Sequence, residues 1–141
     1  MEEYFDYAIR YWYPHMAPAD RTIWERFIKL YPKAYDKVQY DVKLGTIPDF
    51  VKDHTDAVMQ AEASLYQKKI DVIGYAGERI DIIELKPRAA FSAIGQVKGY
   101  VSLYLRDHTP PTTPNAVIIT DALLPDVEHV ASEQSVKIIV V

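Results

Sequence analysis

Three charged residues stand at the far end of a stretch that otherwise reads as two apolar strands joined by a tight turn. The stretch is Asp71–Lys86, DVIGYAGERIDIIELK, and the three residues are Asp71, Glu84 and Lys86. Burying an unpaired charge is costly, so these side chains need solvent, a partner or a chemical role. Two acids and a lysine are residue types that metal-assisted hydrolysis uses.

The turn of this hairpin decides where the two acids lie. Gly77–Glu78 fits a two-residue turn with glycine in its first position. That turn predicts these opposed pairs: Tyr75 with Ile80, Ile73 with Ile82, and Asp71 with Glu84. A three-residue loop would turn Asp71 to the other face. Opposed residues lie about 4.5–5.5 Å apart at Cβ, so two carboxylates there repel each other unless a cation lies between them or one takes up a proton.

The acid pair predicts a site for Mg²⁺ or Mn²⁺. Magnesium typically binds through one or two carboxylates, keeps several waters and takes further ligands from a substrate phosphate. Glu84 and Lys86 point to the same face of the strand, so the lysine is placed to assist an attacking water. The predicted chemistry is hydrolysis of a phosphodiester. The alternative is a solvated hairpin end closed by a salt bridge, because Glu-x-Lys often occurs by chance.

Asp71, followed after twelve residues by Glu84–Lys86, resembles the motif of the PD-(D/E)XK phosphodiesterase superfamily. Gln96 and Tyr100 are similar to the Gln-x-x-x-Tyr motif of its RecB-like exonuclease branch, and four residues apart they share one helix face. The resemblance implies that this pair orients substrate or the acids; simple helix packing is the alternative. The stretch 77–104 is also similar to small phage-encoded members.

The resemblance also implies a metal-binding set. Asp71 and Glu84 would bind the metal with the backbone carbonyl of Leu85, and Lys86 would serve the attacking water. Many members carry a further acid on the first core helix, and Glu25 is the candidate here. Glu25 equally fits a capping box, Thr22-Ile-Trp-Glu, that would only stabilise the start of a helix.

Other charged residues are weaker candidates. Asp41, on an expected strand, is read as part of a solvated face. Pro48–Asp49 matches the letters "PD" but lies 35 residues before Glu84, where no strand is expected, so we leave it out of the site. Three basic residues are predicted to flank the site and contact phosphate, with plain solvation as the alternative: Arg79, Arg88 and Lys98.

Composition indicates a single globular domain over residues 1–141. The chain is 49% hydrophobic and 26% charged, and it has no cysteine for a disulfide or thiolate metal site. It has no apolar run of membrane-spanning length and no basic-then-apolar leader, which favours the cytoplasm, or a host's cytoplasm for a viral protein. The net charge is −4, yet residues 68–106 hold seven basic and four acidic residues. That locally positive region suits weak, salt-sensitive contact with DNA.

The predicted fold class is α/β, a restriction-endonuclease-like core with a central mixed sheet covered by helices on both faces. Strands are expected at 38–44, on both arms of the hairpin, at 116–120 and at 136–141. Helices are expected at 2–12, 22–30, 92–106 and 125–133, and an irregular loop followed by a helix within 46–67. The helix at 2–12 is rich in aromatic residues, which we expect to cap the core or mediate a dimer rather than stack on bases.

Three functions remain open at this point. The leading one is a Mg²⁺-dependent deoxyribonuclease. The second is a structure-specific endonuclease similar to Holliday-junction resolvases, which would act as a homodimer or in a larger recombination assembly. The third is a nucleic-acid-binding or virion structural protein that keeps the fold without turnover. The intact set of Asp71, Glu84 and Lys86 favours an enzyme.

Overall fold

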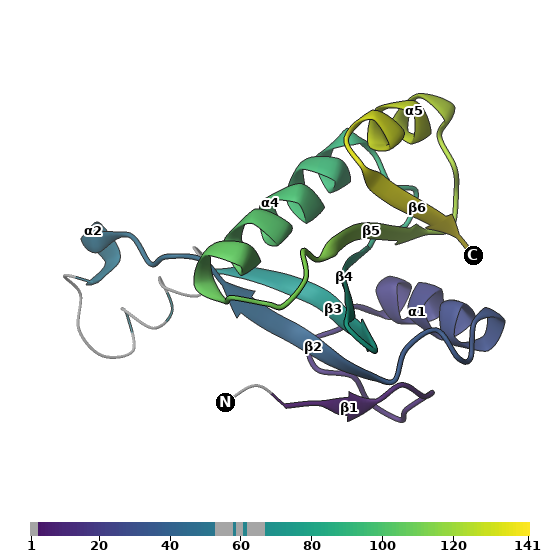
Figure 1. The fold of residues 1–141 in the computed structure, drawn as a ribbon, viewed down its shortest axis with the longest axis horizontal. Helices are drawn as coiled ribbons and strands as arrows, with labels where there is room; N and C mark the ends of the chain where they lie inside the picture. The colour runs from purple at the N-terminus through teal and green to yellow at the C-terminus, as the bar shows by residue number, and fades with distance from the viewer. Residues whose placement is uncertain (1–2, 53–57, 59–60, 62–66) are drawn as a thin grey trace.

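A computed structural model describes residues 3–52, 58, 61 and 67–141 of the chain. Figure 1 shows one sheet with helices packed on both of its faces. The elements, in chain order, are β1 (Phe5–Asp6), α1 (Pro18–Leu30), β2 (Lys37–Leu44), α2 (Asp49–Lys52), β3 (Lys68–Ala76), β4 (Arg79–Leu85), α4 (Phe91–Asp107), β5 (Asn115–Thr120), α5 (Pro125–Glu133) and β6 (Val136–Val140).

The six strands lie in sequence order across the sheet, β1-β2-β3-β4-β5-β6. The pairs from β1 to β4 are antiparallel, and β4-β5 and β5-β6 are parallel, so the sheet is mixed. Helix α1 packs on one face, whereas α4 and α5 pack on the other (Figure 1). The predicted α/β architecture, with a mixed sheet covered on both faces, is confirmed. No helix in the described part of the chain is long and apolar enough to cross a membrane.

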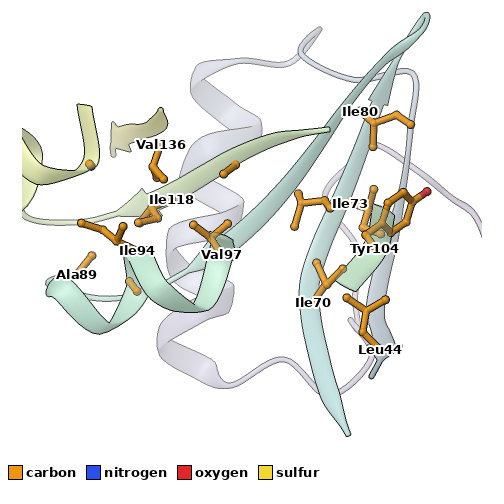
Figure 2. Packing of buried hydrophobic residues seen from close by; sticks show 14 of the residues in the cluster. Leu44, Ile70, Ile73, Ile80, Ala89, Ile94, Val97, Tyr104, Ile118 and Val136 are labelled. Carbon is orange, nitrogen blue, oxygen red and sulfur yellow. The ribbon is translucent and has the colours of Figure 1, made fainter. Parts of the chain in front are cut away.

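Each face of the sheet buries its own apolar cluster. Under α4 and α5, residues at helical spacing such as Ile94 and Val97 meet strand residues such as Ile73 and Ile118 (Figure 2). Under α1, the cluster is aromatic, and the indole of Trp24 stacks on Phe27 with centroids 5.5 Å apart. The two clusters pack against opposite faces of β3 and β4 and so fix the position of this hairpin in the sheet.

The hairpin follows the predicted register. Gly77 has a φ of +59°, the left-handed conformation that the first position of this turn requires. The observed pairs are Tyr75↔Ile80, Ile73↔Ile82 and Val72↔Ile83. The next residues in this register are Asp71 and Glu84.

The helix predicted at 2–12 is wrong in the described residues. Phe5 and Asp6 instead pair with the edge of β2, and the Tyr7 hydroxyl donates to the carbonyl of Tyr31. Tertiary contacts of the aromatic rings with α1 and β2 therefore outweigh the local helical spacing. Helix α1 also begins earlier than predicted, at Pro18. Much of the helix expected within 46–67 falls outside the described residues.

Gly74 leaves room for the ring of Tyr35, which lies flat against the β3 backbone. A Cβ at this glycine would come 2.5 Å from the ring, well inside contact distance. The Tyr35 hydroxyl donates to Asp81 at 2.7 Å, so displacing the ring also breaks a buried hydrogen bond.

We expect Gly74→Ala to lower the free energy of unfolding by about 1–3 kcal/mol, because overpacking forces the ring and backbone apart. Urea unfolding followed by circular dichroism measures the change. Gly95→Ala is the matched control: a Cβ on this helical glycine meets nothing within 4 Å, and alanine favours the helix. Equal stability of Gly74→Ala and wild type would contradict the packing described here.

Candidate active site

The two acids of the hairpin meet where β3 begins and β4 ends. Asp71 is the fourth residue of β3, and Glu84 is the last but one of β4. The backbone N–H of Leu85 donates to Asp71 Oδ2 at 2.9 Å, which fixes the aspartate beside the end of β4. Lys86 follows directly, and its exposed side chain leaves the sheet at the same edge.

Burial raises the pKa of both acids of the hairpin. Glu84 is only 7% exposed, and its Oε2 is buried without a hydrogen-bond partner in the described structure. Burial, and next the charge on Asp71, raise the pKa of Glu84 above its ordinary value. Burial also raises the pKa of Asp71, partly opposed by the Leu85 N–H, and the charges of Asp20 and Asp41 raise it further. A cation at this point would relieve both acids.

A third acid comes from α1, but it is Asp20 rather than the predicted Glu25. Asp20 lies in the first turn of α1, where its charge raises the pKa values of Asp71 and Glu84. Burial raises the pKa of Asp20 itself, and the nearby Lys86 lowers it. Asp20 was not predicted, because the helix was expected to begin at residue 22. Pro18 does not break this helix but begins it, since proline is favoured at the first helical position. In the sequence, Pro18 followed by an acid two residues later is the pattern that indicates a helix start with Asp20 in its first turn.

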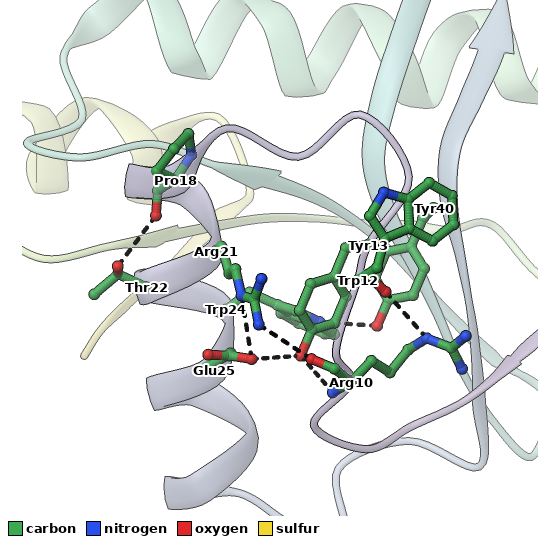
Figure 3. A network of polar contacts seen from close by, with 9 residues as sticks. All are labelled: Arg10, Trp12, Tyr13, Pro18, Arg21, Thr22, Trp24, Glu25 and Tyr40. Carbon is green, nitrogen blue, oxygen red and sulfur yellow. Dashed lines mark hydrogen bonds and ion pairs between the residues drawn. The ribbon is translucent and has the colours of Figure 1, made fainter.

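Glu25 points away from the acid pair. Five residues after Asp20, it is turned by about 140° around the helix axis. Its Oε2 accepts a hydrogen bond from the Tyr13 hydroxyl at 2.8 Å and lies 3.5 Å from Nε of Arg21. Glu25 therefore anchors the N-terminal segment (Figure 3), and the structure does not bring it to the acid pair.

Asp41 also lies near the acids. From the sequence it was expected on a solvated face, away from them. It has a φ of +52° in the middle of β2, and its side chain is mostly buried. His15 Nε2 lies 3.9 Å from Asp41 Oδ2, and a small cavity joins both residues to Asp71. The left-handed backbone at Asp41 breaks the strict alternation of side chains on which the sequence interpretation relied.

Helix α4 brings one of its two predicted residues to the acids. Tyr100 is half-buried, and burial followed by the charges of Glu84 and Asp71 raises the pKa of its hydroxyl to about 12. Gln96 is exposed one turn earlier on the same helix. Lys98 is two residues from each, so it points to a different side of α4 and is also exposed.

The other two basic candidates lie at different distances from the acids. Arg79 does not flank the site: it is five residues before Glu84 on β4, roughly 17 Å away. Its Nη2 donates to the carbonyl of Ala34, and its Nε is 3.5 Å from Asp81. Arg88 is exposed in the loop after Lys86, and its backbone N–H donates to Asp121 at 2.7 Å. Arg88, two residues after Lys86, therefore stays a candidate for a phosphate contact beside the acids, whereas Arg79 does not.

The donor set fits a hard divalent cation such as Mg²⁺. No three acidic, histidine or cysteine side chains of the described residues converge closely enough to hold a metal ion by themselves. One or two carboxylates are what magnesium usually takes from a protein, with water and phosphate completing its coordination. The unpartnered Oε2 of Glu84, beside Asp71, is the observation that such an ion would explain.

No protein-family model matches the chain, and no curated protein matches it. Among solved structures, it is similar to a repair endonuclease from Pyrococcus abyssi, at 21% identity and a TM-score of 0.45 over 52% of this chain and 32% of that one. It is also similar to the structure of an EndoMS–dsDNA2 complex, at 16% identity and a TM-score of 0.49 over 93% of this chain and 47% of that one. The chain thus spans less than half the length of either protein. At these scores neither likeness bears on the chemistry of the site.

Proposed function

We propose that this chain is a metal-dependent nuclease that hydrolyses phosphodiester bonds of DNA. The observation that carries the proposal is the buried Glu84 carboxylate, with one oxygen unpartnered, next to Asp71 at the end of a hairpin that also carries Lys86. Buried acids with raised pKa values beside a specific charge partner cluster at functional sites, which supports this proposal.

Asp71 and Glu84 would hold Mg²⁺ or Mn²⁺, with the Leu85 carbonyl as a further ligand and Asp20 as the acid from α1. Such an ion supplies positive charge that stabilises the phosphate oxygens and makes water more acidic. The two carboxylates release their protons to the solvent when the cation binds, because only the ionised form is a ligand.

The remaining side chains act on the substrate. In hydrolysis, an oxygen of water forms a bond to phosphorus and the bond from phosphorus to the leaving deoxyribose oxygen breaks. The exposed ammonium of Lys86 would hold the attacking water and offset the charge that builds up on the phosphate. Tyr100, with a hydroxyl that stays protonated at neutral pH, would donate a hydrogen bond near the acids, and Gln96 would contact the strand one helical turn away. Arg88 and Lys98 would contact neighbouring phosphates.

We also propose membership of the PD-(D/E)XK superfamily, in its RecB-like exonuclease branch and among small phage-type proteins. The support is the spacing of Asp71 and Glu84–Lys86, together with Gln96 and Tyr100 on one helix. The activity would then be cytoplasmic, in the host cell for a phage protein.

Incubation with a panel of single-stranded, duplex, flapped and four-way DNAs, in Mg²⁺ or Mn²⁺, tests the proposed function. We expect cleavage that requires the divalent ion and that EDTA stops. Cleavage restricted to four-way junctions, by a two-fold dimer, would favour a resolvase. Intact DNA in every lane, with no binding of divalent metal, would contradict a nuclease and favour a non-catalytic nucleic-acid-binding or virion protein.

Asp20 and Glu25 form a matched pair for testing which acid of α1 belongs to the site. We expect Asp20→Asn to lower the cleavage rate about tenfold or more, because it removes a negative charge close to the acid pair. Glu25→Gln is expected to keep the rate of wild type, since the polar partners of Glu25 in the described part of the chain, Tyr13 and Arg21, lie away from the acid pair, and glutamine can still accept from Tyr13. Initial rates at saturating Mg²⁺ measure both, and the opposite ranking would restore Glu25 as the site acid.

A further inference from the structure

The segment Arg10–Met16, just before α1, is held in place by a polar network (Figure 3). The backbone N–H of Arg10 donates to the Tyr13 hydroxyl at 2.9 Å, and that hydroxyl donates to Glu25 at 2.8 Å. Nη2 of Arg21 donates to the carbonyl of Arg10 at 3.2 Å. These contacts tie an irregular segment to a helix, so its outward side chains are presented on a fixed frame.

This segment and α1 line an open surface pocket of about 300 Å³, formed by Trp12, Tyr13, His15, Met16 and Arg21. Trp12 is 58% exposed, so part of its indole is open to solvent. A second, smaller cavity shares His15 and Met16 and is completed by Pro14, Asp41 and Asp71. We name the first pocket the Trp12 groove; His15 and Met16, which line both pockets, lie between it and Asp71 of the candidate active site.

The Trp12 groove combines an aromatic surface with one cation, Arg21, whose Nε also lies 3.5 Å from Glu25 Oε2; aromatic surface and positive charge together bind unpaired nucleic acid. Arg21 lies with its guanidinium carbon 5.3 Å from the Tyr13 ring centroid and lines the same cavity as Trp12. The imidazole of His15 lies between this cavity and Asp41. A volume of about 300 Å³ is at the lower end for small-molecule sites and suits a single nucleotide.

We propose that the Trp12 groove holds an unpaired nucleotide of the DNA strand next to the phosphate that is cut. The inference rests on the proposed nuclease function and adds its substrate class, DNA with an unpaired stretch at the site. The base stacks on Trp12 because only an unpaired base exposes its face, and Arg21 attracts the neighbouring phosphate. His15 and Met16 line both the groove and the small pocket at Asp71, so a nucleotide in the groove lies on the side of the molecule that carries the acid pair.

The binding of a fluorescently labelled eight-nucleotide oligothymidylate, followed by anisotropy, tests the groove. Ca²⁺ replaces Mg²⁺ as the oxygen-liganded ion, and a gel of the recovered oligonucleotide checks that it stays intact. We expect Trp12→Ala to weaken binding by about 5- to 150-fold, the loss expected for one stacked base. Tyr11→Ala is the matched control, since this neighbouring aromatic is 96% exposed but does not line the cavity.

Intrinsic fluorescence gives a second readout. The chain has two tryptophans, and Trp24 is fully buried, so quenching of the emission by oligothymidylate reports on Trp12. We expect this quenching with the single strand and not with a blunt-ended duplex. Equal binding by wild type, Trp12→Ala and Tyr11→Ala, or equal quenching by the duplex, would overturn the proposal.

The two proposals fail in different ways. If the protein cuts no DNA in Mg²⁺ but binds oligothymidylate through Trp12, the groove stands and the proposed chemistry falls. If it cuts DNA and Trp12→Ala binds and cuts single strands as wild type does, the chemistry stands and the groove is overturned.

Discussion

Glu84→Gln is expected to abolish DNA cleavage and, at the same time, to make the metal-free protein more stable. Glutamine keeps the shape of the side chain but removes the charge that would bind the metal. Charge stabilisation by a bound ion contributes several kcal/mol to such a reaction, so the rate should fall by about 10³-fold or more. Gel assays with saturating Mg²⁺ measure the loss.

The gain in stability has the same physical origin. In the metal-free protein, Glu84 places a buried carboxylate with an unpartnered oxygen close to Asp71. A neutral amide costs less to bury, and at pH 8 we expect the free energy of unfolding to rise by about 1–3 kcal/mol. Glu78→Gln makes the same chemical change in the exposed turn of the same hairpin and should alter neither property. A Glu84→Gln protein that still cuts DNA, or that is much less stable, would count against the metal site.

The stability of the metal-free protein should fall as the pH rises above about 5. Asp71 and Glu84 have raised pKa values in the folded protein, whereas in the unfolded chain such groups titrate near pH 4. Above pH 4 the folded form therefore binds more protons than the unfolded form, and the free energy of unfolding decreases with pH. The contribution of each acid is complete below its unfolded pKa and is lost as the pH rises through its folded pKa. The loss amounts to about 1.4 kcal/mol for every pH unit that separates the folded pKa from the unfolded one.

Thermal unfolding between about pH 5 and pH 8, in EDTA and in Mg²⁺, measures this effect. Mg²⁺ should restore stability at pH 8 far more than at pH 5, because the metal binds only the ionised acids. Comparison with Glu84→Gln isolates the site from other titrating groups, and this variant should show a shallower pH dependence in EDTA. A pH profile that is identical in wild type and Glu84→Gln would show that burial does not perturb these acids.

The hairpin could be predicted from the sequence because one local feature determines it. Gly77 in a two-residue turn sets the register, and the register places Asp71 beside Glu84 on adjacent strands. The helix carrying Tyr100 was equally clear, since its apolar residues recur at helical spacing over four turns. A mixed sheet covered on both faces was predicted from its continuous apolar strands, but the order of the strands across the sheet was not.

The rest of the site depended on features that no local pattern specifies. Asp20 reaches the acids only because α1 begins at Pro18 and crosses the sheet with its first turn at that edge. Asp41 reaches them because its backbone is left-handed, which the alternation of a regular strand cannot predict. His15 comes from an irregular segment that tertiary hydrogen bonds hold in place, and it had no signal in the sequence.

Calorimetric titration of Mn²⁺ into the protein at pH 8 tests the central claim most directly, because it asks whether Asp71 and Glu84 share an ion without requiring any substrate. We expect wild type and Glu25→Gln to bind Mn²⁺, and both Asp71→Asn and Glu84→Gln to lose binding. Absence of binding by wild type, or binding that survives both of the last two substitutions, would contradict this claim.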